Sequence, residues 1–108
     1  DPDDLVPIDV NPVFNNWPES IKHFAWQRKS DGAIVVPFWR MDQLQKKDVD
    51  FDSELTLELP ESFTVSRMDV MDLHANQPLP VGFHQEGRTL KTAVHITRRA
   101  AWLILHAQ

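Results

Sequence analysis

The sequence contains no cysteine, no tyrosine and only three glycines among its 108 residues. Without cysteine, the chain can form no disulfide, no cysteine-ligated zinc site and no thiol nucleophile. Three isolated glycines build no phosphate-binding loop, and neither a Gly-x-Ser-x-Gly elbow nor a His-Glu-x-x-His motif occurs. The residues therefore offer no self-sufficient catalytic motif.

Positive charge and long apolar runs are also scarce. Eleven lysines and arginines stand against sixteen aspartates and glutamates, so the formal net charge is −5. An acidic chain is a poor partner for nucleic acid or an anionic membrane. No apolar run approaches the roughly 18 residues that span a bilayer. We expect neither nucleic acid nor a membrane as partner. The sequence has no signal-peptide pattern and opens on Asp1 instead of methionine, which suggests an excised or processed piece.

Half of the eight prolines lie within residues 1–20. Proline removes a backbone donor and restricts the preceding residue, so helix and central strand are both disfavoured here. The segment also carries scattered apolar residues that need cover from this domain or a neighbour. We predict an extended proline-rich arm over 1–20, formerly an interdomain segment, with one short edge strand at 8–10. The folded domain is predicted over 21–108.

A hairpin is predicted around the turn-forming residues 29–32, Lys-Ser-Asp-Gly, which join strands at 21–28 and 33–41. The strand at 33–41 is apolar on both faces, so we expect one face in this core and the other against something else. Pro37 lies inside that strand and removes a ladder hydrogen bond. A bulge there, or a free edge on one side, would accommodate it.

The remaining apolar alternations predict further short strands at 55–59, 63–73, 81–84, 90–97 and 102–106. The phase changes between Val65 and Met68, which predicts a bulge near Ser66 and Arg67. Residues 98–105 could also form a helix, but strand fits their neighbours better. Short strands at this spacing predict an all-β fold, an antiparallel two-sheet β-sandwich of about seven or eight strands with immunoglobulin-like or related topology.

The acidic loop offers the one candidate metal site, a calcium site at Asp48, Asp50 and Asp52. Alternating acids resemble a calcium-binding loop, yet the EF-hand spacing places Ser53 where glycine belongs and Leu59 where glutamate belongs. A solvated loop is therefore favoured, with calcium kept as the only cofactor to test. The five histidines show no ligand spacing, although His23 and His95 could meet across a sheet.

Asp69 and Asp72 could be taken for the paired carboxylates of a glycosidase. A separation of three residues on a strand points them to opposite faces unless a bulge intervenes. We therefore predict that they are not a catalytic pair, and we assign no catalytic residue to this chain.

Aromatic side chains are the remaining candidates for a ligand site. Trp39 and Trp102 lie in strongly apolar strands and are predicted to be core residues. Trp17 lies between Asn16 and Pro18 in the arm, so it is the best candidate for stacking on a sugar ring. Packing against another domain is nevertheless the favoured role for Trp17, because aromatics dominate interfaces.

Three segments taken together resemble a known family: FAWQRKSDGAIVVPFWR (24–40), LTLELPESFTVSRMDVMDLHANQPLPV (55–81) and LKTAVHITRRAAWLIL (90–105). They are similar to the C-terminal β-sandwich accessory domain of bacterial TIM-barrel glycoside hydrolases. Trp39 matches that family's hairpin tryptophan, Asp72 the aspartate before its turn, and Asn76 the turn residue. Residues 98–101 depart from the pattern, since such domains often carry a proline there.

The resemblance implies a non-catalytic accessory domain that packs against and stabilises a catalytic barrel absent from this chain. The expected partner is then the catalytic domain of the same parent chain. Two alternatives stay open: a carbohydrate-binding module that uses exposed aromatics, and an immunoglobulin-like protein-interaction domain. A flat row of aromatics rimmed by polar groups would favour sugar binding, whereas a contiguous apolar patch would favour docking.

Overall fold

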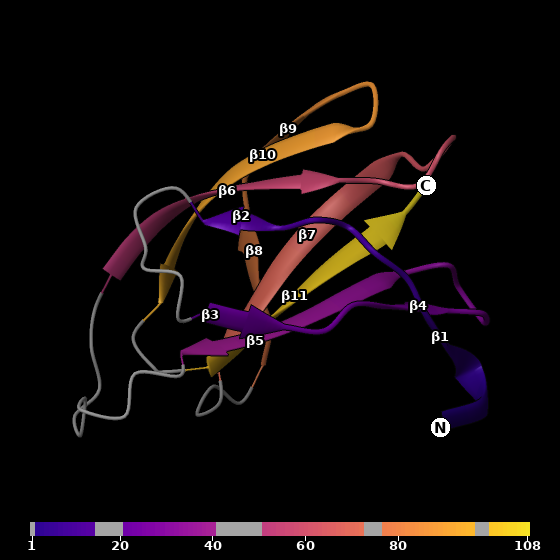
Figure 1. The fold of residues 1–108 in the computed structure, drawn as a ribbon. Coiled ribbons are helices and arrows are strands. Elements are labelled where there is room, and N and C mark those ends of the chain that lie inside the picture. The colour runs from indigo at the N-terminus through magenta and orange to yellow at the C-terminus, as the bar shows by residue number, and fades with distance from the viewer. Residues whose placement is uncertain (1, 15–20, 41–50, 73–76, 97–99) are drawn as a thin grey trace.

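The structure is a computed structural model that describes residues 2–14, 21–40, 51–72, 77–96 and 100–108 (Figure 1). These residues form one 3-10 helix and eleven strands: η1 (Pro2–Asp4), β1 (Leu5–Pro7), β2 (Val13–Phe14), β3 (Ile21–His23), β4 (Trp26–Arg28), β5 (Ile34–Arg40), β6 (Phe51–Glu58), β7 (Val65–Asp72), β8 (Leu79–Val81), β9 (Phe83–Glu86), β10 (Thr89–Ile96) and β11 (Ala100–Ala107).

The strands form two antiparallel sheets that lie face to face (Figure 1). The larger sheet has seven strands in the order β1-β4-β5-β11-β7-β8, with β3 also paired to β5. The smaller sheet has the order β2-β6-β10-β9. The predicted all-β, antiparallel two-sheet sandwich is confirmed. The strands outnumber the predicted seven or eight because the arm adds two and the predicted strands at 21–28 and 81–84 each divide.

Alternate residues of both sheets form one core between them. Ile34, Val36 and Phe38 of β5 point inward and are at most 2% exposed. The inward side chains of the other long strands are similarly buried: Leu55 and Leu57 of β6, Met68 of β7, Leu90 and Val94 of β10, and Leu103 and Leu105 of β11. The two-residue period of the sequence thus determines which side chains leave water.

The N-terminal arm belongs to both sheets. β1 pairs with β4 in the larger sheet, and β2 pairs with β6 in the smaller one. Between them Val10 is fully buried, and its carbonyl accepts a hydrogen bond from the Glu58 amide at 2.8 Å. The edge strand predicted at 8–10 is wrong, because this stretch crosses between sheets and turns at Asn11, where φ is 44°. The division of the chain at residue 20 stays a prediction.

Pro37 is accommodated by its neighbour on the larger sheet. Pairing of β5 with β3 and with β4 keeps a single register, so no bulge occurs at Pro37. Instead the neighbouring strand is interrupted at residues 24–25, where Phe24 donates its amide to the Pro37 carbonyl at 3.0 Å. Proline has no N–H to return, so the ladder breaks there. Neither predicted solution, a bulge or a free edge, is the one the fold uses.

The bulge predicted near Ser66 and Arg67 is confirmed. His106 pairs with Arg67 and Ala107 with Val65, which leaves Ser66 without a residue opposite it in β11. The Ser66 hydroxyl lies 3.2 Å from the His106 carbonyl and 3.3 Å from that of Ala107. The strand form of the C-terminal segment is confirmed as well, since Ala100–Ala107 is β11.

Candidate interaction surface

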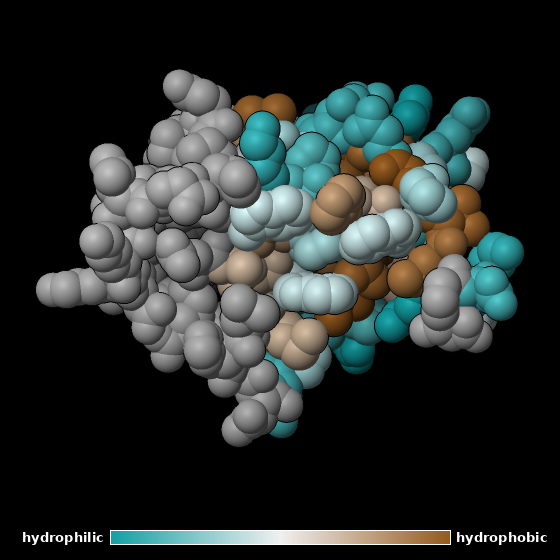
Figure 2. All heavy atoms as spheres, turned by 60° about the horizontal axis from the view of Figure 1, so that its bottom comes forward, coloured by the Kyte–Doolittle hydropathy of each residue, from teal (hydrophilic) through white to brown (hydrophobic). Residues whose placement is uncertain are grey.

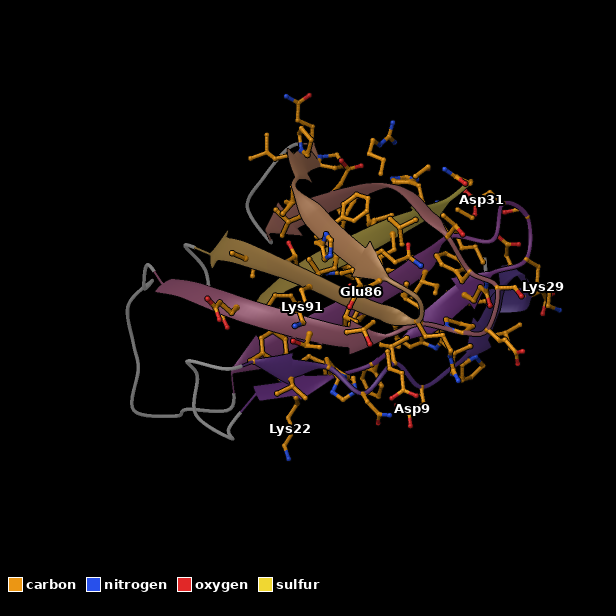
Figure 3. All side chains as sticks on the ribbon, turned by 90° about the horizontal axis from the view of Figure 1, so that it is seen from above. Asp9, Lys22, Lys29, Asp31, Glu86 and Lys91 are labelled. Atoms are coloured by element: carbon orange, nitrogen blue, oxygen red, sulfur yellow. The ribbon has the colours of Figure 1, made fainter. Side chains whose placement is uncertain are left out.

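The outer face of the smaller sheet is polar. The side chains between its buried residues are exposed and mostly charged or hydrophilic: Glu54, Glu58, His84, Glu86 and Lys91. Figure 3 looks down on this side, with Glu86 and Lys91 labelled. A face of this composition is stable in water without a partner.

The outer face of the larger sheet is apolar. Its central residues are mainly large hydrophobic side chains, which we name the apolar face: Phe24, Trp26, Val35, Pro37, Trp39, Met71, Trp102 and Ile104. Figure 2 shows this side, where brown and pale residues gather across the middle and teal ones lie at the rim. Phe24 is 56% exposed and Trp102 is 38% exposed. Exposed apolar side chains that lie together, unlike scattered single ones, are typical of an interaction surface.

Three aromatic rings pack together on the apolar face. The Phe24 ring centroid lies 5.3 Å from that of Trp26, with the planes 30° apart. It lies 5.3 Å from the Trp39 centroid, at an angle of 41°. These contacts are in the range where aromatic pairs stabilise one another.

The prediction that Trp39 and Trp102 belong to the core is wrong. Both alternate with inward residues of β5 and β11, so they lie on the outer face. When a strand is apolar on both faces, its sequence does not show which alternate residues point into the core. Val35, on the same face, is only 7% exposed, so this chain buries it without a partner. The case for a partner therefore depends on Phe24 and Trp102.

A groove of about 430 Å³ runs through the apolar face. Its lining, which defines what we name the tryptophan groove, is Leu5, Trp26, Val35, Met71, Trp102 and Ile104, together with Asp4 and Arg28. The groove thus brings together β1, β4, β5, β7 and β11, five strands from distant parts of the chain. No local sequence signal indicates it, because only the pairing order makes these strands neighbours.

Both charged groups of the groove are already partnered. Arg28 donates to the Asp31 carboxylate through Nε at 3.1 Å and through Nη2 at 2.8 Å. The Asp4 carboxylate accepts from the amide and the hydroxyl of Ser30, at 2.9 and 2.8 Å. A ligand in the groove would therefore meet chiefly apolar surface.

Asp31 completes the hairpin turn beside this groove. Its carboxylate accepts the Ala33 amide at 3.0 Å and also faces the Arg28 guanidinium. These two hydrogen bonds, the backbone one foremost, lower the pKa of Asp31 below the ordinary 3.8. Gly32 supports the same turn with a φ of 76°, a conformation in which a side chain would be strained.

Asp69 lies on the outer side of β7 and is buried, with 7% exposure. Its Oδ2 lies 2.9 Å from His106 Nε2 and 3.4 Å from Arg67 Nε. Local sequence does not predict this cluster, because it depends on the register of β7 against β11. Asp69 is thus held in an ion-paired network, while the side chain of Asp72 lies outside what the structure describes.

Several predicted site residues lie outside the described residues, namely Trp17, Asp48 and Asp50. Asp52 falls in β6, and nothing is described of its side chain, so the calcium site stays a prediction. Within the described ranges, no group of three or more histidines and acids could hold a metal ion. His23 lies in the larger sheet and His95 in the smaller, so their predicted meeting across one sheet is wrong. No helix in the described part of the chain is long and apolar enough to cross a membrane.

No protein-family profile matches the sequence, and no curated protein matches it either. The fold is similar to part of the alpha-L-fucosidase isoenzyme 2 from Paenibacillus thiaminolyticus, with a TM-score of 0.69 and 12% identity. That likeness covers 94% of this chain and 16% of the fucosidase chain. A second likeness, to the catalytic domain of GH30 xylanase C from Talaromyces cellulolyticus, covers 91% of this chain and 21% of that one. It has 14% identity and a TM-score of 0.43, which is too low to support an argument.

Proposed function

We propose that this chain is a non-catalytic accessory β-sandwich domain of a glycoside hydrolase, which packs against the enzyme's catalytic barrel and stabilises it. The observation that carries the proposal is the contrast between the two outer faces. The smaller sheet presents charged residues to water, whereas the larger sheet presents the apolar face. An antiparallel sheet that faces water is normally polar on that side, so the apolar face calls for cover.

Two further observations support this proposal. The fold of nearly the whole chain is similar to a 16% portion of a fucosidase, as a small domain of a larger enzyme would be. The described chain is itself an antiparallel sandwich, without the alternating strands and helices of a TIM barrel. The proposal therefore places the catalytic acids on another domain of the parent chain.

The composition of the tryptophan groove favours a protein partner over a sugar. Sugar sites combine aromatic faces with polar groups that are available to bind hydroxyls. Here Arg28 and Asp4, the charged residues of the lining, are already bonded to Asp31 and Ser30. The apolar face is a contiguous patch instead of a row of rings among available polar groups.

The test begins with the coding sequence around this domain, which should encode a catalytic barrel in the same chain. The parent enzyme is then expressed with and without these 108 residues. We expect the thermal midpoint of the catalytic domain to fall by several degrees when the sandwich is removed. A parent chain without a glycoside hydrolase domain, or an unchanged midpoint, would overturn the proposal.

One observation favours the second candidate, a carbohydrate-binding module. The exposed Phe24 ring, stacked on Trp26, is a flat aromatic surface that could contact a sugar ring. A glycan array with the isolated chain tests this function, with Trp17→Ala and Phe24→Ala as variants. Clear binding that either substitution abolishes would support the module and count against a purely structural role.

A further inference from the structure

The charged groups in and beside the tryptophan groove are hydrogen-bonded within this chain, the Asp4 carboxylate by the neutral amide and hydroxyl of Ser30. Arg28 pairs with Asp31 at 2.8 Å, and Asp69 is held by His106 and Arg67. A charged partner group would lose its hydration against a mainly apolar lining whose two charged residues are already hydrogen-bonded, which is costly. The complementary partner surface is therefore uncharged and apolar.

The edges of the larger sheet argue against a partner that adds a strand. Its edge strands β1, β8 and β3 are each three residues long, and β1 and β8 also contain a proline, Pro7 and Pro80. Short edge strands with proline offer an incomplete hydrogen-bond ladder to another chain. Short edges of this kind favour contact through the face of the sheet.

We propose that the tryptophan groove receives one large uncharged side chain, such as leucine, methionine or phenylalanine, from the catalytic domain of the parent enzyme. This inference rests on the proposed function and deepens it, since it locates the centre of the interface. Trp102 is the anchor, because a half-exposed tryptophan beside a groove has the character of an interface hot spot. The polar residues at the rim exclude water and contribute little affinity.

Hydroxyl-radical footprinting of the parent enzyme and of the 108-residue chain tests this arrangement. Methionine and tryptophan side chains oxidise readily when water reaches them, so the modification of Met71 and Trp102 reports cover directly. We expect both to be modified about tenfold less in the parent enzyme than in the isolated chain. His84 on the polar smaller sheet is the internal control, and its modification should not change.

The decisive variants are made in the parent enzyme. Met71→Lys places a cation in the groove, and Trp102→Ser removes one wall. Each should restore the modification of Phe24 and Trp26 to the level of the isolated chain, whereas Trp102→Phe should keep the protection. Ala93→Lys is the matched control, since Ala93 is exposed on the smaller sheet. The thermal midpoints of the same variants in the isolated chain show that each still folds. If one of the two groove substitutions disturbs folding, the other still gives a result.

Three results would count against the inference, and they differ in what else they overturn. If Phe24 and Trp26 stay protected in the parent enzyme with both Met71→Lys and Trp102→Ser, the groove is not the centre of the interface. The proposed function is then unaffected. No protection in the parent enzyme overturns the proposed function and the groove with it. A stable dimer of the isolated chain with Trp102 already protected, seen by sedimentation, would show that a second copy is the occupant.

Discussion

At the residue scale, Asp31 shows how one exposed carboxylate organises a turn. It accepts hydrogen bonds from the Ala33 amide and the Arg28 guanidinium, and both bonds favour its ionised form. Because Arg28 lines the tryptophan groove, Asp31 also fixes a side chain of the candidate surface. The ionisation of Asp31 thus links the stability of the hairpin to pH.

We predict that Asp31 makes stability depend on pH in the acid range. Its pKa is lowered in the folded state, so below the ordinary 3.8 the unfolded chain binds more protons than the folded one. The stabilisation is present above pH 3.8 and is lost as the pH falls through the folded-state value. Urea unfolding from pH 5 to 2 measures it, and Asp31→Asn should flatten this part of the profile. An unchanged profile in Asp31→Asn would contradict the assignment.

Gln85 is a second single residue on which the stability of the fold depends. Its Oε1 accepts the Val65 amide at 2.9 Å, and its Nε2 donates to the carbonyls of Phe63 at 2.8 Å and Gly87 at 2.9 Å. The side chain therefore ties β9 of the smaller sheet to the start of β7 in the larger one.

We predict that Gln85→Ala lowers the free energy of unfolding by about 1–3 kcal/mol, because partly buried backbone groups lose their partners. His84→Ala, at the exposed neighbouring position, should change it by less than about 0.5 kcal/mol. Equilibrium urea unfolding of both variants measures the difference. Equal midpoints for the two would show that water replaces the three hydrogen bonds without loss.

At the scale of elements, the sequence predicted what local pattern determines. The turn at residues 29–32, the bulge at Ser66 and the alternation of β10 depend on residues close together in the chain. The predicted strand at 81–84 failed because β8 pairs with β7 while β9 pairs with β10, so the chain changes sheets at Gly82. Strand pairing depends on residues far apart in the sequence, so the periodicity within one segment does not predict it.

The arm contributes more to the core than its composition predicts. Prolines correctly indicated extended backbone, but the burial of Val10 depends on contacts with both sheets. Apolar residues in an irregular segment can join a core without any regular period. The arm is therefore part of what stabilises the sandwich.

We predict that Val10→Ala destabilises the isolated chain by about 2 kcal/mol, since it removes buried methyl groups and leaves a cavity. Val13→Ala in the same arm is the matched control, because Val13 is 53% exposed. Its effect should stay within about 0.5 kcal/mol. Thermal and urea unfolding give both values. If the two variants behave alike, the arm does not contribute to the core as the structure indicates.

At the scale of the whole molecule, the fold class could be predicted from the sequence, but the candidate surface could not. The double-faced strand at 33–41 indicated a second apolar face, and that face exists. Which tryptophans lie on it depends on the phase of β5 and β11, and the groove depends on the order of five strands. Composition indicated many aromatic and apolar residues, but it did not show which of them lie on the surface.

In the isolated chain, the apolar face as a whole is open to a dye-binding test. A folded domain with an uncovered apolar face should bind the apolar dye 8-anilinonaphthalene-1-sulfonate while it keeps its cooperative unfolding. The double substitution Phe24→Ser and Trp102→Ser removes the two most exposed aromatics of the apolar face and should lower the dye fluorescence to less than about half. Ala93→Ser and Thr56→Ser on the smaller sheet, made together, should leave it unchanged. Dye fluorescence at equal protein concentration, with circular dichroism as a check on folding, measures both. Equal fluorescence from both double variants would show that the dye reports some other surface, and the contrast between the two faces would then lose its functional meaning.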